Sequence, residues 1–235
     1  MPALLARLLL ALAYPWIAHA ATARGSAPLA TIALADIALI VLLPALLARR
    51  IGAWLLAIAL VPLLLRLAHS PHAQLPLLLV PVAFIAMVAW AFGRTLRTGR
   101  VPLITRIVSA LDGTTPALLA PELRTYTRKL TATWAGMLAL LALVNLVLAL
   151  IAVPDGWLAS FGVAPPLSVT ESQWSWFANV CNYGLLGGLF IGEYLLRKRR
   201  FPGRYASFAD FLRRMAALGP VFWRDLLREP AARGE

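Results

Sequence analysis

Long apolar runs dominate this sequence, and several of them approach twenty residues. A helix needs about 20 residues to cross the hydrocarbon core of a bilayer, which is about 30 Å thick. The runs are continuous rather than alternating, and a bilayer offers no water to satisfy the open edge of a sheet, so helices are expected rather than strands. Six membrane-spanning helices are therefore predicted: Leu4–Ala20, Leu29–Ala48, Ile51–Leu65, Leu75–Phe92, Thr131–Val153 and Trp174–Leu196.

The composition agrees with a chain that is surrounded mostly by lipid. Hydrophobic residues make up 61% and charged residues 14% of the 235 residues, against about a half and about a quarter in soluble domains. The predicted fold class is all-α: a polytopic helical membrane protein with about six transmembrane helices and additional cytoplasmic amphipathic helices. The third run is short and contains Pro62, so a tilted, kinked or re-entrant segment is an alternative for it.

The first run has two interpretations. Arg7, a short apolar core and the small residues Ala18-His19-Ala20 fit a secretory signal peptide with its cleavage site. Tyr14-Pro15-Trp16 interrupts that core, and the charged start is weak, which favours an uncleaved first helix. Either way the second helix enters the membrane from the outer side.

The positions of the basic residues predict the orientation. With both termini inside, the cytoplasmic segments contain 20 of the 22 Lys and Arg residues, and the loop of residues 154–173 contains none. Cationic flanks resist translocation, so this asymmetry places the C-terminus in the cytoplasm. The chain then divides into four helices (residues 1–93), a basic cytoplasmic loop (94–130), two further helices (131–196) and a basic cytoplasmic tail (197–235).

The net charge of +12 is concentrated beside apolar runs, which favours anionic lipid headgroups over nucleic acid as the partner. Glu193 precedes four consecutive cations and can form an i,i+4 ion pair with Arg197 at headgroup depth. A functional carboxylate facing a cavity is the alternative for Glu193. The predicted headgroup-binding residues are Arg94, Arg97, Arg100, Arg197, Lys198, Arg199 and Arg200.

Both cytoplasmic segments contain amphipathic patterns. In Pro102–Leu111 the apolar residues Ile104, Ile107, Val108 and Leu111 recur at helical spacing, with Arg106 off that face. In the tail, Ser207 and Asp210 have capping-box spacing, an apolar face follows, and Gly219-Pro220 ends the helix before a second short one. The first helix is predicted to lie on the inner leaflet, and the tail helices either to lie at the membrane surface or to pack on the protein's own cytoplasmic loop.

Polar residues inside the apolar runs are the remaining candidates for function. Asp36 lies near the middle of the second run with no cation within a helical turn, so we weigh a neutral packing role against a proton- or substrate-handling one. Asp36 and Glu193 are the weak catalytic candidates. Predicted helix-packing residues are the amides Asn145, Asn179 and Asn182, and the GxxxG glycines Gly184, Gly188 and Gly192, which would admit another helix or a second copy of the chain.

Metal and cofactor chemistry have little support in the sequence. The three histidines, His19, His69 and His72, fall near the outer face without carboxylates close in sequence, and the single cysteine, Cys181, cannot form an internal disulfide. No Walker loop, nucleophile elbow, zinc-protease motif or dinucleotide fingerprint occurs. No metal and no cofactor are predicted.

The second half of the chain resembles a family of small polytopic bacterial inner-membrane proteins associated with gene clusters for aryl polyene and xanthomonadin-type pigments. The resemblance covers roughly residues 92–223. It implies an inner-membrane location and a pathway that builds a polyene on an acyl carrier protein, and it implies no catalytic residue. The runs that carry it are FGRTLRTGRVPLITRIVSALDG, PELRTYTRKLTATWAGMLALLALVN, WSWFANVCNYGLLGGLFIGEYLLRKRRFP and SFADFLRRMAALGPVFW.

Three functions follow as hypotheses. The first is a non-catalytic accessory protein that supports assembly or envelope placement of a lipid-like pigment, with anionic lipids, an acyl carrier protein or pathway enzymes as partners. The second is a membrane-embedded acyl or lipid transferase using Asp36 or Glu193. The third is a lipid or pigment transporter, although no internal repeat is evident.

Overall fold

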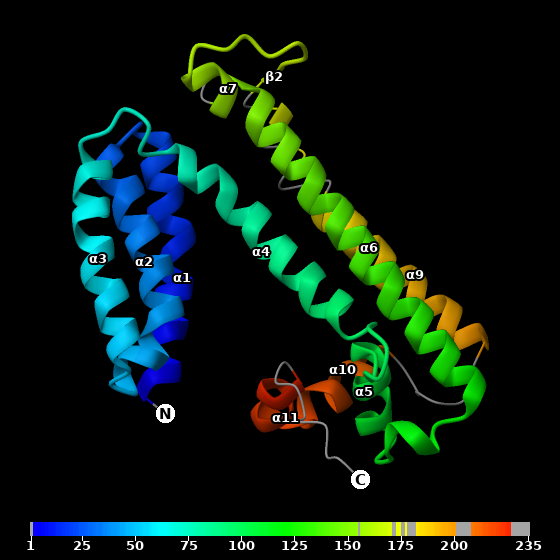
Figure 1. The fold of residues 1–235 in the computed structure, drawn as a ribbon. Coiled ribbons are helices and arrows are strands. Elements are labelled where there is room, and N and C mark those ends of the chain that lie inside the picture. Colours follow the sequence, from blue (N-terminus) through cyan, green and yellow to red (C-terminus); the bar gives the residue numbers. More distant parts are fainter. Residues whose placement is uncertain are drawn as a thin grey trace. The chain divides into compact units, whose positions relative to one another are not determined.

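The computed structural model describes residues 2–154, 156–170, 173–174, 177, 182–200 and 208–226. Helices dominate it, and the two β-strands have two residues each (Figure 1). In chain order the elements are α1 (Pro2–Ala23), α2 (Ala27–Leu47), α3 (Ile51–Ala68), α4 (Leu75–Arg94), α5 (Leu103–Leu111), η1 (Pro116–Leu118), α6 (Pro121–Ile151), β1 (Ala152–Val153), α7 (Trp157–Ser160), β2 (Val169–Thr170), α9 (Asn182–Arg200), α10 (Phe208–Ala217) and α11 (Gly219–Leu226).

Five of these helices are long and apolar enough to cross a membrane: α1 from Leu5, α2, α3, α4 and α6. The protein is thus an all-α polytopic membrane protein. α3 is a continuous helix of 18 residues despite Pro62, about 27 Å long, so it is longer than the 15 residues predicted. The predicted sixth span lies partly outside the described residues, and its described part is α9, which ends in four cations.

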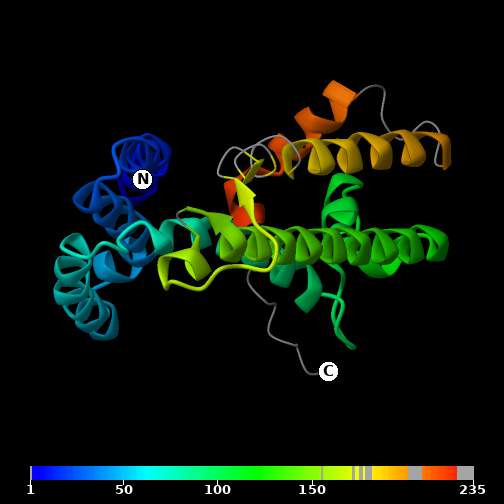
Figure 2. The same cartoon turned by 90° about the horizontal axis from the view of Figure 1, so that it is seen from above.

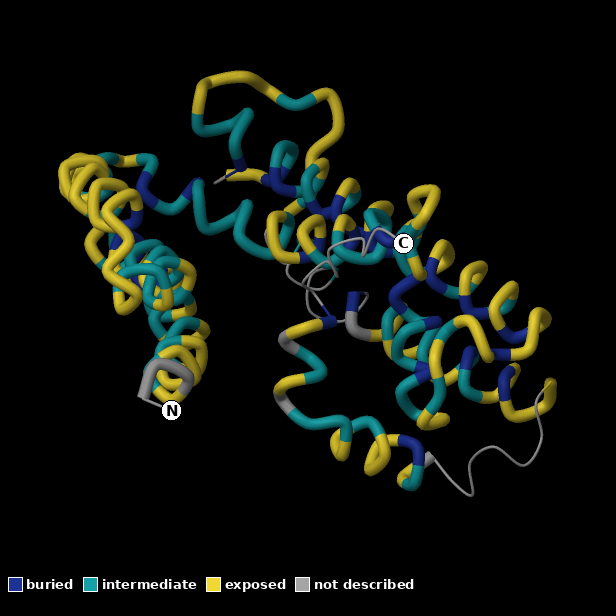
Figure 3. Tube along the Cα trace, turned by 60° about the horizontal axis from the view of Figure 1, so that its bottom comes forward, coloured by how far each residue is buried: buried dark blue, intermediate teal, exposed yellow. Residues whose placement is uncertain are grey.

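The chain forms two compact units, residues 1–82 with 146–171, and residues 83–145 with 172–235. In the first unit, α1, α2 and α3 run side by side (Figure 1). At one end of this bundle the fully buried alanines Ala21, Ala30 and Ala73 form a small cluster, because residues without large side chains let helices approach closely. Many residues of these helices are exposed (Figure 3), and the exposed ones include large apolar residues, as a lipid-facing surface requires.

In the second unit, α6 and α9 run alongside each other (Figure 2) in opposite directions. Near one end, Asn145 and Asn182 exchange two amide hydrogen bonds of 3.1 and 3.0 Å, and both side chains are buried. Asn145 also donates to the Leu141 carbonyl. Each side-chain amide thus has the other as its partner instead of facing hydrocarbon. A shift of α6 along α9 would break both hydrogen bonds, so the pair favours one register of the two helices. Asn179 lies outside the described residues.

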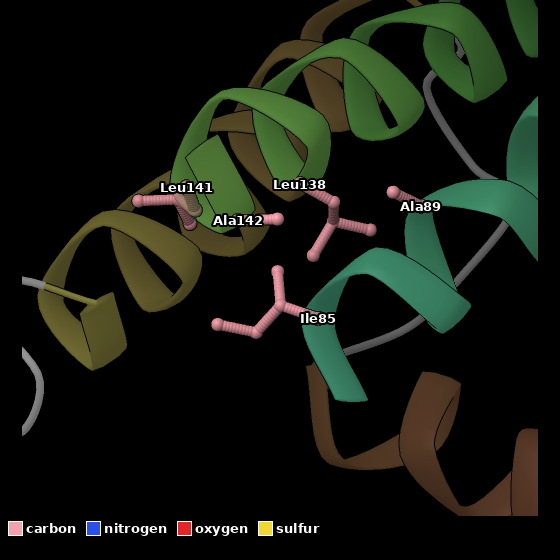
Figure 4. Close-up of a cluster of buried hydrophobic side chains, with 5 residues drawn as sticks. All are labelled: Ile85, Ala89, Leu138, Leu141 and Ala142. Atoms are coloured by element: carbon pink, nitrogen blue, oxygen red, sulfur yellow. The ribbon is translucent and has the colours of Figure 1, made fainter. Parts of the chain in front are cut away.

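An apolar cluster joins α4 to α6 within the second unit. Figure 4 shows its five buried side chains, which come from α4 and α6: Ile85, Ala89, Leu138, Leu141 and Ala142. Phe92 and Trp134 extend the cluster, with ring centroids 6.2 Å apart. Their helices therefore pack by interlocking side chains, which is the main source of association where lipid replaces water.

α5 docks on α6 through threonine hydroxyls. Thr127 and Thr131 are fully buried, and the Thr105 and Thr127 hydroxyls lie 2.7 Å apart. The first N–H groups of a helix have no partner within it. Here the Leu103 N–H donates to the Thr95 hydroxyl (3.0 Å), and the Ile104 N–H donates to Thr131 (3.3 Å). Side chains from outside α5 thus cap its N-terminus.

The buried residues of α5 only partly coincide with its apolar face. The sequence places Ile104, Ile107, Val108 and Leu111 on one face, and the structure buries Leu103, Thr105, Val108 and Ser109. Two hydroxyls are buried because each finds a hydrogen-bond partner, Thr105 with Thr127 and Ser109 with the Arg106 carbonyl. Of the apolar face, Val108 is buried and Ile104 packs against it, while contact of the other residues with the membrane stays a prediction.

The tail helices pack on the second unit. Phe211 of α10 is buried, with its ring 6.3 Å from Phe190 of α9 and 4.5 Å from the Arg197 guanidinium. Arg106 of α5 donates hydrogen bonds to the backbone carbonyls of Asp225 and Leu226. A cation therefore pairs with the carbonyl groups at the C-terminal end of α11, where the helix dipole is negative. These contacts agree with packing on the protein's own loop. Leu212 and Val221 remain exposed, which leaves an apolar surface for membrane contact.

Candidate functional site

A groove of about 650 Å³ lies between α6 and α9, at the end of the pair where α6 begins and α9 finishes. We call this the basic end. The α6 residues that line the groove recur at helical spacing, and so do those of α9, which means that one face of each helix forms a wall. The lining residues are Tyr126, Lys129, Leu130 and Thr133 of α6, and Gly188, Leu189, Gly192, Glu193, Leu196, Arg199 and Arg200 of α9.

Two of the glycines predicted to admit a helix help to form this hollow. A Cβ atom placed on Gly188 or Gly192 would meet nothing within 4 Å among the described residues. The same holds for Gly184, which does not line the groove. Within the described part of one chain, these glycines therefore border open space rather than a closely packed helix. Close packing against a second copy stays a prediction.

The carboxylate of Glu193 is held in an ion pair and is not free in the groove. Its Oε1 atom is 3.2 Å from Arg197 Nε, and both side chains are buried. Tyr126 donates a long hydrogen bond of 3.5 Å to the same oxygen. The guanidinium of Arg200 lies 5.8 Å from the Tyr126 ring. Because Arg197 neutralises Glu193, the groove keeps the positive charge of its three exposed cations, Lys129, Arg199 and Arg200.

No protein-family model, curated protein or solved structure matches this chain. The assignment of function therefore depends on the site itself, and the resemblance described from the sequence stays a prediction.

The structure separates the predicted headgroup-binding cations into three groups. Arg199 and Arg200 line the groove, whereas Lys198 is exposed beside it. Arg197 is 6% exposed and forms the predicted ion pair with Glu193, while its predicted headgroup role stays a prediction. The third group consists of Arg94, which ends α4, and of Arg97 and Arg100, which follow it; none of the three lines the groove.

Arg94 instead belongs to a second cationic region. Its guanidinium lies over the Trp90 ring, 4.7 Å from the centroid. Burial, and to a smaller extent the positive charge of Arg94, lowers the pKa of the Arg106 guanidinium from its ordinary value. Arg97 is exposed and Arg100 half-buried. Arg94 thus lies close to Arg106, the residue that joins α5 to α11.

Asp36 and the histidines lie in the first unit. Asp36 is 8% exposed, and its Oδ2 atom has no hydrogen-bond partner among the described residues. His72 stacks on Phe161 at 5.4 Å, and Nδ1 of His69 lies 2.8 Å from the Leu65 carbonyl. In the described ranges, no three His, Cys, Asp or Glu side chains come close enough to hold a metal ion.

The sequence reasoning missed Lys129 and Tyr126 as parts of the site. Their signal is the i, i+3, i+4, i+7 spacing of Tyr126, Lys129, Leu130 and Thr133, which places a cation and a phenol on one face with apolar residues. That spacing is visible in the sequence, but its meaning depends on knowing that α9 covers this face.

Proposed function

We propose that this protein is a non-catalytic component of the bacterial inner membrane that holds the phosphate headgroup of an anionic lipid at its cytoplasmic face. The observation that carries the proposal is the groove between α6 and α9. It combines three exposed cations, Lys129, Arg199 and Arg200, with walls formed by Leu130, Leu189 and Leu196.

The chemistry of the groove favours a lipid over a small soluble anion. Lys and Arg provide the charge-assisted donors that phosphate oxygens accept. The adjoining leucines and the gap above Gly188 and Gly192 suit the first part of an acyl chain. A free phosphate ion would use the cations and leave the apolar walls uncovered.

The distribution of charge supports the proposed orientation. The groove lies at the basic end, where α9 finishes with Arg197, Lys198, Arg199 and Arg200. Positive flanks stay on the cytoplasmic side during insertion, and the cytoplasmic leaflet attracts basic residues by about 1 kcal/mol each. The ion pair of Glu193 with Arg197 favours a structural role for this carboxylate over the transferase hypothesis.

The resemblance to pigment-cluster proteins supplies the biological role that we propose for this lipid site. The protein would support assembly or envelope placement of an aryl polyene lipid, and its exposed arginines would attract the acidic carrier protein that holds the precursor. Deleting the gene and profiling lipids of the inner and outer membranes separately tests this role. We expect loss of the pigment lipid or its retention in the inner membrane, and an unchanged profile would contradict it.

Neutralising the groove is expected to weaken binding of anionic lipid. Each of Lys129→Gln, Arg199→Gln and Arg200→Gln removes about 1 kcal/mol of attraction, or about fivefold in affinity, and the triple variant about a hundredfold. Native mass spectrometry of the purified protein, titrated with phosphatidylglycerol and with phosphatidylcholine, measures the bound lipid. We expect a preference for phosphatidylglycerol that the triple variant loses.

Two matched controls separate this site from general surface charge. Lys198→Gln removes an equally exposed cation that does not line the groove, and Gly187→Leu adds a side chain outside it, in contrast to Gly188→Leu, which fills it. Gly188→Leu should reduce lipid binding without any change of charge. If Lys198→Gln weakened binding as much as Arg199→Gln, or Gly187→Leu as much as Gly188→Leu, the groove would not be the binding site.

A further inference from the structure

A buried acid in the first unit lies apart from the lipid groove. Asp36 is the tenth of the 21 residues of α2, about 15 Å from either end of the helix. Its side chain is more than nine-tenths buried, and Oδ2 has no hydrogen-bond partner in the described part of the chain. The carboxyl group is therefore shielded from solvent in the middle of an apolar helix.

The surroundings of Asp36 supply no compensating charge. Among the described helices, α1 and α3 pack against α2. Of their titratable groups, Tyr14 of α1 lies close enough for electrostatic interaction with Asp36. The others are Arg7 and His19 on α1 and Arg66 on α3.

The position of Tyr14 follows from the connection between the helices. α1 and α2 are joined by the short turn of residues 24–26, so they run in opposite directions and residues equidistant from the turn meet. Tyr14 and Asp36 are equidistant from it. A phenol is neutral at physiological pH and can donate or accept a hydrogen bond, so it provides a polar neighbour without a positive charge.

An ionised carboxylate at this depth would be costly. Placing one at the centre of a membrane helix costs about 2.5–3.5 kcal/mol on insertion scales, and no described cation forms an ion pair with Asp36 that could offset this cost. The protonated acid avoids most of the cost because it carries no net charge. The uncharged form is therefore the one that the bundle accommodates.

We propose that Asp36 is a proton-binding site, a carboxylic acid that keeps its proton inside the first unit and exchanges it across the α1–α2 interface beside Tyr14. The ligand is a single proton. Loss of that proton leaves a charge that the bundle does not neutralise, so deprotonation requires entry of water or of a cation. The site thus links the protonation of one residue to the packing of α1 on α2.

Carbodiimide labelling tests this site. Dicyclohexylcarbodiimide is apolar and adds to protonated carboxylic acids: the acid oxygen bonds to the central carbon, the proton moves to a nitrogen, and the adduct rearranges to a stable N-acylurea with no leaving group. At pH 8 ordinary carboxyl groups, with a pKa of about 4, are ionised and unreactive. We expect peptide mapping of the full-length protein in liposomes to find one adduct, at Asp36, and none at the ion-paired Glu193.

Infrared spectroscopy provides a second measurement that does not depend on reagent access. The C=O band of a protonated carboxyl group should be present at pH 8 and should be lost in Asp36→Asn. Absence of this band, or labelling of Asp36 no faster than of Glu193, would overturn the proposal. Protection of Asp36 by sodium but not by choline at the same ionic strength would also overturn it, because the site would then bind a metal cation.

Discussion

Replacing Glu193 by alanine is expected to lower the free energy of unfolding of the second unit by about 3–5 kcal/mol. The change leaves the guanidinium of Arg197, which is 6% exposed, without the carboxylate 3.2 Å away. A buried charge that loses its partner costs far more than the pair itself contributes. Reversible unfolding in mixed micelles, followed by circular dichroism, measures the loss.

The chain contains a matched control for this ion pair. Asp210 and Arg214 form a pair with the same i,i+4 spacing and a separation of 3.0 Å, but the side chains are 52% exposed for Arg214 and 21% for Asp210, against 7% and 6% in the Arg197–Glu193 pair. Asp210→Ala should cost about 1 kcal/mol or less. Glu193→Leu combined with Arg197→Met should recover part of the stability, because no charge remains buried. Equal losses for Glu193→Ala and Asp210→Ala would contradict a buried, structural ion pair.

Phe211→Ala is expected to release α10 from the second unit. The change removes a buried ring that contacts Phe190 and Arg197, which costs about 3–5 kcal/mol for an aromatic side chain in a core. A detached helix of ten residues is too short to persist in water. Hydrogen exchange of the α10 amides should therefore accelerate at least a hundredfold, as measured by mass spectrometry.

Leu212→Ala is the control for this prediction. Leu212 is the next residue on α10, and 44% of it is exposed, so its removal should change the exchange of α10 by less than about tenfold. If Phe211→Ala left the exchange of α10 unchanged, the contact with α9 would not hold the helix. If both variants accelerated exchange equally, the effect would come from the helix itself rather than from its docking.

The membrane-spanning helices were the most predictable part of the fold. A bilayer demands a long apolar helix, so composition and length alone located α2 within two residues at its start and one at its end. Pro62 made α3 harder to predict, because a proline removes one backbone hydrogen bond. The helix nevertheless continues to Ala68, so the loss of this bond does not end it.

The packing of α5 could not be read from hydrophobic spacing. Hydrophobic spacing makes Ile107 a better candidate for burial than Thr105, yet Thr105 is only 3% exposed. The reason is a hydroxyl partner, Thr127, 22 residues further along the chain. Two threonines at i,i+4 spacing, Thr127 and Thr131, were the available signal. Its meaning depends on which segment docks there, which a single sequence does not specify.

The candidate site was predictable in part. The i,i+4 spacing from Glu193 predicted its pair with Arg197, and this pair distinguishes one cation from its three neighbours. The sequence could not show that Lys129 joins Arg199 and Arg200 around one groove. That arrangement depends on the opposite directions of α6 and α9, which bring residues about 70 positions apart to the same level.

The hydroxyl contacts between α5 and α6 also have a mechanical consequence. α6 has 31 residues and is about 46 Å long, well beyond the thickness of the hydrocarbon layer. Helices adjust to thicker or thinner bilayers by tilting. Because Thr127 and Thr131 hold α5 on the protruding part of α6 through hydrogen bonds, we expect α5 to move with α6 when α6 tilts. A change in bilayer thickness would then rotate α5 on the water-exposed side of the membrane.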